Sequence, residues 1–103
     1  MTPHPRGVWV DPYVHVALIE YAWLKRTTMS EVIRAVLDHI VEHPEDDSYL
    51  SVDDRPGRKR LAAKTSDEQW EAASKVAQDA GVGFHSLIRR HIIKVLKEEG
   101  LLE

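Results

Sequence analysis

Two histidines four residues apart have the spacing of a chemical site. His39 and His43 fall in a segment with helical periodicity, with Glu42 between them. One face of a helix can present such a pair to Zn²⁺ or Ni²⁺. No further ligand follows in a known metal-binding motif, and Pro44 ends the helix after His43. We therefore predict no metal site here, and we expect His91 to be a buried or interface histidine.

Residues for catalysis do not form a recognisable set in this chain of 103 residues. The sequence has no Ser-His-Asp order, no phosphate-binding loop and no paired carboxylates on one face. The absence of cysteine excludes a disulfide framework, thiolate-bound zinc and a cysteine nucleophile. We expect a binding protein that needs no cofactor, not an enzyme.

Basic side chains are the remaining candidates, because Lys and Arg bind phosphates and base edges. The formal net charge is −3, from 14 basic and 17 acidic residues. Residues 42–54 hold six of the acids and no Lys or Arg, so the rest of the chain has a balance of +3. This acidic stretch runs into Pro56-Gly57, which predicts an exposed linker over residues 44–57 and not a packed element. A basic cluster follows: Arg55, Arg58, Lys59 and Arg60.

One strand and two helices are predicted before this linker. Val8-Trp9-Val10 is a β-prone run, and Asp11-Pro12 is typical of the start of a helix, with Asp as the N-cap. Apolar residues at helical spacing predict a helix over 12–25 and a second from about 28–30 to 43.

The same order of elements is predicted after the linker. A strand over 59–65 precedes Ser66, which forms a capping box with Gln69 at the start of a helix over 67–80. Gly81 is a left-handed C-cap, and a last helix covers 85–99. The halves 1–43 and 58–103 are related by an offset of 55 residues, which matches Arg26 with Gly81 and Ser30 with His85.

Each half resembles the ribbon-helix-helix family of DNA-binding proteins, the MetJ, Arc and CopG group. Residues 28–35 (TMSEVIRA) and 81–90 (GVGFHSLIRR) carry the resemblance and look like the turn and second helix of the family. The resemblance covers nearly all of the chain except the N-terminal tip and the linker. Arg26 stands where a turn glycine is usual, and Gly83 and His85 stand where small hydroxyl residues are common.

The resemblance implies that the two halves form one shared core. Members of the family fold as dimers, and their two strands pair antiparallel into a ribbon that enters the major groove. One chain would here supply both halves. The expected fold is mainly α with a short two-stranded antiparallel ribbon, in which strand 7–10 pairs with strand 60–65. The result would be a pseudo-twofold single-chain dimer.

The alternation of side chains along a strand predicts which ribbon residues would contact bases. The side chains expected to face the helices are Val8, Val10, Leu61, Ala63 and Thr65. The side chains expected to face DNA are Gly7, Trp9, Arg60, Ala62 and Lys64. Arg60 and Lys64 suit guanine, and Ala62 suits a thymine methyl group. For Trp9, packing in the core is the alternative.

The N-terminus of each second helix offers free backbone N–H groups to a phosphate. The predicted phosphate contacts are Thr27, Thr28 and Ser30 in the first half, Gly83 and His85 in the second, and Arg58 and Lys59 beside the ribbon. N-capping is the simpler role for Thr28 and Ser30. For Arg34 and Arg89, which match the arginine of the family, we favour structural salt bridges over DNA contact.

The expected function is sequence-specific binding of double-stranded DNA. Within the family this implies a transcriptional repressor or a plasmid accessory factor of the kind that assembles at a transfer origin, with further copies of the chain or another protein as partners. The alternative is an antitoxin or a protein–protein assembly adaptor with little direct DNA binding. The sequence lacks a signal-peptide pattern and has no apolar run near the roughly 20 residues of a membrane span, so we expect a cytoplasmic protein.

Overall fold

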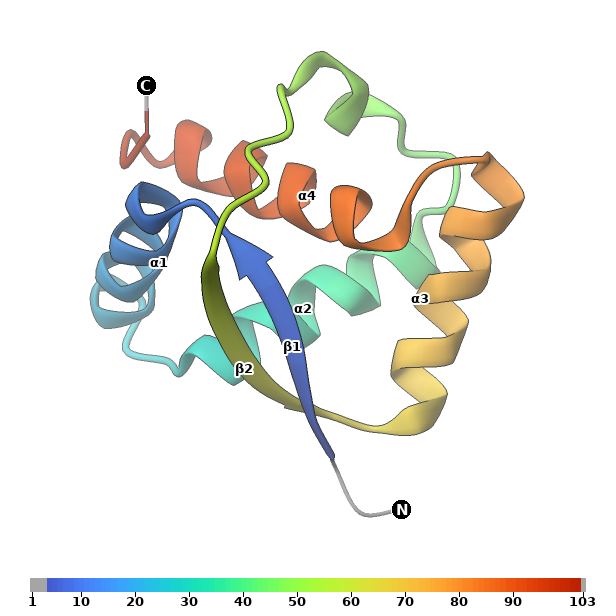
Figure 1. Cartoon of the computed structure of the whole chain (residues 1–103), viewed down its shortest axis with the longest axis horizontal. Helices are drawn as coiled ribbons and strands as arrows, with labels where there is room; N and C mark the ends of the chain where they lie inside the picture. The colour runs from blue at the N-terminus through green and yellow to red at the C-terminus, as the bar shows by residue number, and fades with distance from the viewer. Residues whose placement is uncertain (1–3, 103) are drawn as a thin grey trace.

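The computed structural model describes residues 4–102, in which two strands are packed against four α-helices. The elements in order are β1 (His4–Val10), α1 (Pro12–Leu24), α2 (Met29–Glu42), a 3₁₀ helix (Ser48–Ser51), β2 (Lys59–Thr65), α3 (Asp67–Ala80) and α4 (Phe84–Glu98). Figure 1 shows the two strands in front, with α1 and α3 on either side of them and α2 and α4 behind. The predicted mainly helical fold with a two-stranded antiparallel sheet is therefore confirmed.

β1 and β2 pair antiparallel, with Gly7 opposite Ala62 and Val8 opposite Leu61. The inward side chains are at most 1% exposed and are those of Val8, Val10, Leu61, Ala63 and Thr65, as the alternation predicts. β1 begins three residues earlier than predicted, at His4, which lies opposite Thr65. The partner strand extends β1, because pairing supplies hydrogen bonds to residues with little β propensity of their own.

Local capping interactions start three of the helices. Asp11 accepts a hydrogen bond from the Tyr13 backbone N–H at 2.8 Å, and Pro12 follows it in the first turn of α1. Thr28 accepts from the Glu31 N–H at the start of α2, and Ser66 accepts from the Gln69 N–H at the start of α3, both at 3.1 Å. Each such cap contributes about 1 kcal/mol.

The core lies between the inner face of the ribbon and the helices α2 and α4. From α2 it takes the buried residues Val32, Ile33, Val36, Leu37 and Ile40. From α4 it takes Leu87, Ile88, His91, Ile92, Ile93 and Leu96. Residues of both halves belong to this single cluster. Burying one Leu or Ile side chain contributes about 1.5–3 kcal/mol, so this core holds a two-stranded ribbon that would be marginal alone.

The connecting segment between the halves is partly packed, which corrects the predicted exposed linker over 44–57. Tyr49, in the 3₁₀ helix, and Val52 are both buried in the core. Figure 1 shows the segment arching over α4 before it enters β2. Gly57 allows the segment to pass close to the end of β1, because a Cβ at this position would lie 2.1 Å from the Val10 carbonyl oxygen. The acidic composition of the segment did not indicate that Tyr49 and Val52 would be buried.

Corresponding elements of the two halves begin 55 residues apart. β1 and β2 begin at residues 4 and 59, α1 and α3 at 12 and 67, and α2 and α4 at 29 and 84. The turns after α1 and α3 also correspond, since Arg26 and Gly81 both have positive φ angles, of 52° and 73°. None of the helices within residues 4–102 has the length and apolar character needed to cross a bilayer.

Replacing Arg26 by glycine should stabilise the fold. A left-handed conformation costs a non-glycine residue roughly 1–2 kcal/mol, and glycine avoids this cost. The greater flexibility of glycine in the unfolded chain offsets about 0.5–1 kcal/mol of that gain. We expect Arg26→Gly to raise the free energy of unfolding in urea by about 0.5–1 kcal/mol. Arg26→Ala removes the same charge and keeps the backbone strain, so it should give no gain. Equal stabilisation by both variants would contradict this explanation.

Candidate nucleic-acid interface

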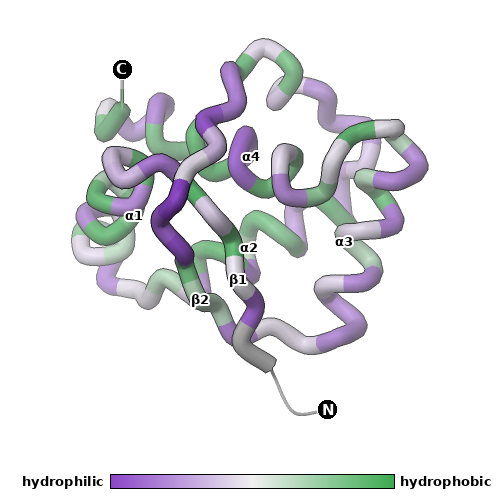
Figure 2. The backbone as a smooth tube through the Cα atoms, viewed as in Figure 1, coloured by the Kyte–Doolittle hydropathy of each residue, from purple (hydrophilic) through white to green (hydrophobic). Residues whose placement is uncertain are grey.

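The outer face of the ribbon combines basic side chains with one large aromatic ring. Arg60, Ala62 and Lys64 of β2 are exposed, and Trp9 of β1 is 48% exposed. Trp9 therefore points away from the core, which removes the packing alternative for this residue. No residue within 4–102 forms an ion pair with Arg60 or Lys64. Figure 2 shows the hydrophilic start of β2 beside the apolar end of β1.

Gly7 provides room on this face instead of a side chain. A Cβ placed on Gly7 would lie 2.6 Å from Nε of Arg60, so the arginine side chain crosses the ribbon above the glycine. Gly7 and Ala62, which lie opposite each other, leave a low centre between the longer side chains. Gly7 thus leaves room for the Arg60 side chain, and its contact with a base stays a prediction.

Two residues of α2 close the open edge of β2. Arg34 donates from Nη1 to the Lys64 carbonyl oxygen at 2.8 Å, and the Ser30 hydroxyl accepts from the Lys64 backbone N–H at 3.3 Å. An edge strand otherwise presents unpaired backbone groups. Arg34 therefore holds β2 through a backbone hydrogen bond, whereas its predicted salt bridge is limited to Glu31 at 4.0 Å. Ser30, predicted to contact phosphate, has its hydroxyl engaged with the ribbon.

Arg89 of α4 makes the corresponding contact with β1. Its Nη1 lies 3.5 Å from the Trp9 carbonyl oxygen. The same guanidinium forms a bidentate ion pair with Asp54 of the connecting segment, at 2.7 and 2.9 Å. The hydrogen bond from Arg89 and a weaker one from Ser86 hold the pKa of the Asp54 carboxyl below its usual range, against the opposing effect of burial. Arg89 thus links β1, α4 and the connecting segment.

The N-terminus of α2 is poorly suited to a phosphate. The Thr28 side chain already caps the helix, and the Thr27 hydroxyl is hydrogen-bonded to the Glu31 carboxylate. Glu31 places a negative charge in the first turn, where the helix dipole favours it and where a phosphate would otherwise bind. Thr27 and Thr28 are thus occupied by local contacts, and Ser30 by β2.

The N-terminus of α4 lacks these competing groups. The N-cap residue of α4 is Gly83, which offers no side-chain hydrogen bond, and the first turn of the helix has no acidic residue. His85 is exposed, and its ring lies 6.1 Å from that of Trp70. Arg58 is exposed just before β2, and Lys59 is exposed at the first position of β2, opposite Val10 and on the helix side of the ribbon. The predicted phosphate contacts therefore differ between the halves, and the second half keeps more of them free.

The histidines at the end of α2 have carboxylate neighbours from the connecting segment. His43 Nδ1 lies 3.4 Å from a Glu45 carboxylate oxygen, and His39 Nε2 lies 2.6 Å from one of Asp46. Asp46 was missed from the sequence because it lies outside the helical spacing of the histidine pair.

α1 has a broad apolar face that residues 4–102 leave exposed. Tyr13 is 78% exposed and Trp23 is 80% exposed, and Val16, Ile19 and Leu24 are exposed on the same helix. Only Val14, Ala17, Leu18 and Ala22 of α1 are buried. The sequence carried a signal for this face, because α1 has apolar residues on all sides instead of an apolar and a polar side.

Comparisons with protein-family models, curated protein sequences and solved structures give no match to this chain.

The Asp54–Arg89 ion pair gives a prediction for stability and its pH dependence. Asp54→Ala leaves the mostly buried Arg89 guanidinium without its partner, which should cost about 2 kcal/mol of unfolding free energy in urea. Because folding lowers the pKa of Asp54, the contribution is complete above pH about 4 and fades as the pH falls through the lowered pKa. The difference between wild type and variant should shrink accordingly.

Asp53→Ala is the matched control, because Asp53 is the exposed neighbour of Asp54. This variant should change the unfolding free energy by less than about 0.5 kcal/mol. An equal loss in both variants, or a loss for Asp54→Ala that persists undiminished in acid, would contradict the assigned ion pair.

Proposed function

We propose that this chain binds double-stranded DNA sequence-specifically by placing the outer face of its β1–β2 ribbon in the major groove. The observation that carries the proposal is the basic row of Arg60 and Lys64, which is exposed and has no acidic partner within residues 4–102. A two-stranded ribbon fits the width of the major groove. We assign no catalytic role to these residues.

Each outward side chain has a distinct role in this proposal. Arg60 donates to guanine O6 and N7, and Lys64 donates to guanine or phosphate. Ala62 contacts a thymine methyl group, and the Trp9 ring packs on methyl groups or sugars. Arg58, Lys59 and the N-terminus of α4 then contact the phosphates beside the ribbon.

We further propose that the chain is a tandem ribbon-helix-helix pair with pseudo-twofold symmetry. The strand register supports this, because the offset of 55 residues maps Gly7 onto Ala62, and these two residues lie opposite each other. An axis between them would exchange β1 with β2. The matched starting residues of strands and helices agree with the same operation.

The contacts of Arg34 and Arg89 with the ribbon give independent support for the tandem pair. The offset maps Arg34 onto Arg89, and it maps Trp9 onto Lys64. Arg34 bonds the carbonyl of Lys64, and Arg89 contacts the carbonyl of Trp9. Each second helix therefore contacts the strand of the opposite half at equivalent positions, as expected of an intertwined dimer.

The unlike outer faces of the two strands imply an asymmetric DNA site. β2 offers Arg60 and Lys64, whereas Trp9 is the exposed outward residue of β1. The Arg6 guanidinium of β1 is unavailable, because it pairs with Asp67 and lies 5.4 Å from the centre of the Trp70 ring. The cellular role that we propose is a transcriptional repressor or a plasmid-transfer accessory factor acting at such a site in the cytoplasm.

Removing both basic side chains should weaken DNA binding without unfolding the chain. We expect Arg60→Ala combined with Lys64→Ala to reduce affinity for duplex DNA at least about 10-fold, since each good base contact contributes about 1–3 kcal/mol. The salt dependence of the affinity, measured by fluorescence anisotropy between about 50 and 200 mM salt, should become less steep.

The matched control is Lys75→Ala combined with Lys97→Ala, which removes the same charge from exposed positions of α3 and α4. This variant should lose far less affinity, and circular dichroism should show both variants folded. Equal losses would indicate a non-specific charge effect, and no DNA retention by the folded wild type at low salt would refute the proposed function.

A second candidate function, protein–protein assembly, is favoured by the apolar face of α1. This helix has one acidic side chain, Glu20, one histidine, His15, and no Lys or Arg. An isologous interface brings each patch against the same patch of a second copy, so like charges within the patch would repel. A face with so few charges therefore suits self-association. We take a second copy of this chain as the partner.

Sedimentation velocity over a range of concentrations tests the self-association. Wild type should form a dimer as the concentration rises, and Trp23→Ser should shift the equilibrium to the monomer, because it removes the most exposed large apolar side chain of α1. Leu50→Ser is the control, since Leu50 is also exposed but lies in the 3₁₀ helix. A wild type that stays monomeric throughout would exclude assembly through α1.

A further inference from the structure

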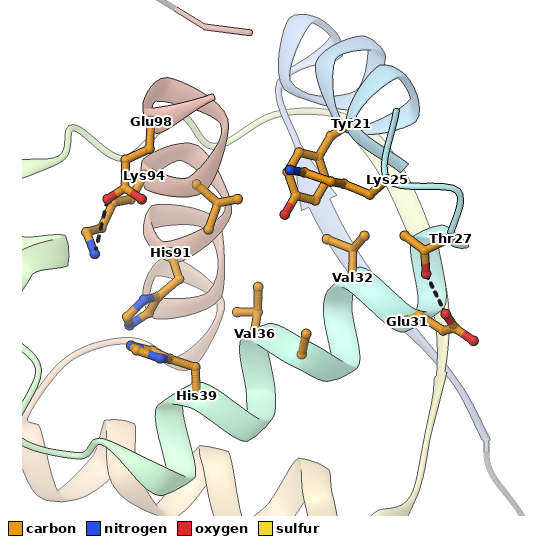
Figure 3. A pocket seen from close by; sticks show the side chains of 12 residues that line it. Tyr21, Lys25, Thr27, Glu31, Val32, Val36, His39, His91, Lys94 and Glu98 are labelled. Atoms are coloured by element: carbon orange, nitrogen blue, oxygen red, sulfur yellow. Dashed lines mark hydrogen bonds and ion pairs between the residues drawn. The ribbon is translucent and has the colours of Figure 1, made fainter. Parts of the chain in front are cut away.

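His39, Asp46 and His91 meet although they come from three separate segments. His39 lies in the last turn of α2, Asp46 in the connecting segment and His91 in the middle of α4. One potential metal-ligand atom from each lies within 4.8 Å of the others. Figure 3 shows the two imidazole rings facing each other at one end of a groove between α2 and α4.

The spacing of these three side chains is close to that of a metal site. His39 Nε2 and Asp46 Oδ2 are 2.6 Å apart, and the two imidazole centroids are 5.5 Å apart. Ligand atoms bound at about 2.0–2.1 Å around a tetrahedral ion lie roughly 3.3 Å from one another. Small side-chain rotations would therefore increase the distance between His39 Nε2 and Asp46 Oδ2 and bring the ligand atom of His91 closer, to about the separation found around a tetrahedral ion.

Asp46 is held in place by Ser48. Its Oδ1 accepts from the Ser48 backbone N–H at 3.0 Å and from the Ser48 hydroxyl at 2.5 Å. The other oxygen, Oδ2, is directed at His39. Hydrogen bonds of this kind orient the ligands of metal sites and are a second part of their architecture.

His91 is the buried member of the cluster, with only 6% of its surface exposed. Among the described residues its ring contacts are with His39 and Tyr49, and no hydrogen bond occupies its nitrogens.

A lysine near the cluster is already paired. Lys94, one turn after His91, has its ammonium 3.4 Å from the Glu98 carboxylate. The carboxylate of Asp46 supplies the negative charge that favours a divalent cation between the imidazoles.

We propose that His39, Asp46 and His91 bind one divalent transition-metal ion of the zinc class. Two imidazoles and one carboxylate suit Zn²⁺, and three protein ligands leave a fourth position for water. A bound ion would tie α2 and the connecting segment to α4, so it would fasten the two halves to each other. This inference is independent of DNA binding and revises the expectation that the chain has no metal site.

Zinc titration of the full chain, without a histidine tag, tests the site by calorimetry. We expect one Zn²⁺ per chain and a rise in melting temperature with zinc, because the ion binds only the folded arrangement. Co²⁺ should give the visible absorption of a tetrahedral site. Asp46→Asn and His39→Gln, which preserve side-chain size, should each weaken zinc binding by roughly 100-fold, and Ser48→Ala by about 10-fold.

His15→Gln is the control, because it removes a histidine of α1 outside the cluster, and it should bind zinc as wild type does. Circular dichroism without metal establishes that each variant folds, and Ser48→Ala tests the site with all three ligands intact. Absence of 1:1 zinc binding by wild type would overturn the proposal. Undiminished binding by folded Asp46→Asn and His39→Gln would overturn it equally.

Discussion

Pairing between β1 and β2 is the interaction on which the remaining contacts depend. Each half supplies one strand and two helices, and a segment of that size buries too little apolar surface to fold alone. The register with Val8 opposite Leu61 sends five side chains into the core and leaves Arg60 outside. A slip of one residue would exchange these faces, so the same register specifies both the core and the basic surface.

Two acids of the connecting segment, Asp46 and Asp54, are engaged by neighbouring side chains and not by the basic residues of β2. Asp54 neutralises Arg89, whose guanidinium also reaches the backbone of β1, and Asp46 accepts hydrogen bonds from Ser48. The net charge of −3 therefore says little about the surface that would meet DNA. The basic residues of β2 remain exposed beside Trp9, and this uneven face is what distinguishes the two halves.

Features set by neighbouring residues were predictable from the sequence, and features set by distant partners were not. The caps at Asp11 and Ser66 and the alternation in β2 are local, so helix starts and strand faces agree with expectation. The burial of Tyr49 depends on a surface formed by the folded helices, which composition does not describe. The cluster of His39, Asp46 and His91 likewise forms only when three segments fold together, so the spacing of these residues in the sequence does not indicate it.

Guanine-methylation interference on a duplex selected from a random-sequence pool tests the proposed contact of Arg60 with guanine most directly. Methylation at N7 places a group in the major groove, where Arg60 is proposed to donate, whereas methylation of adenine N3 lies in the minor groove. We predict that methyl groups at guanine N7 block binding, at positions that are not related by twofold symmetry. Failure to enrich any duplex, or interference confined to adenine N3, would contradict it.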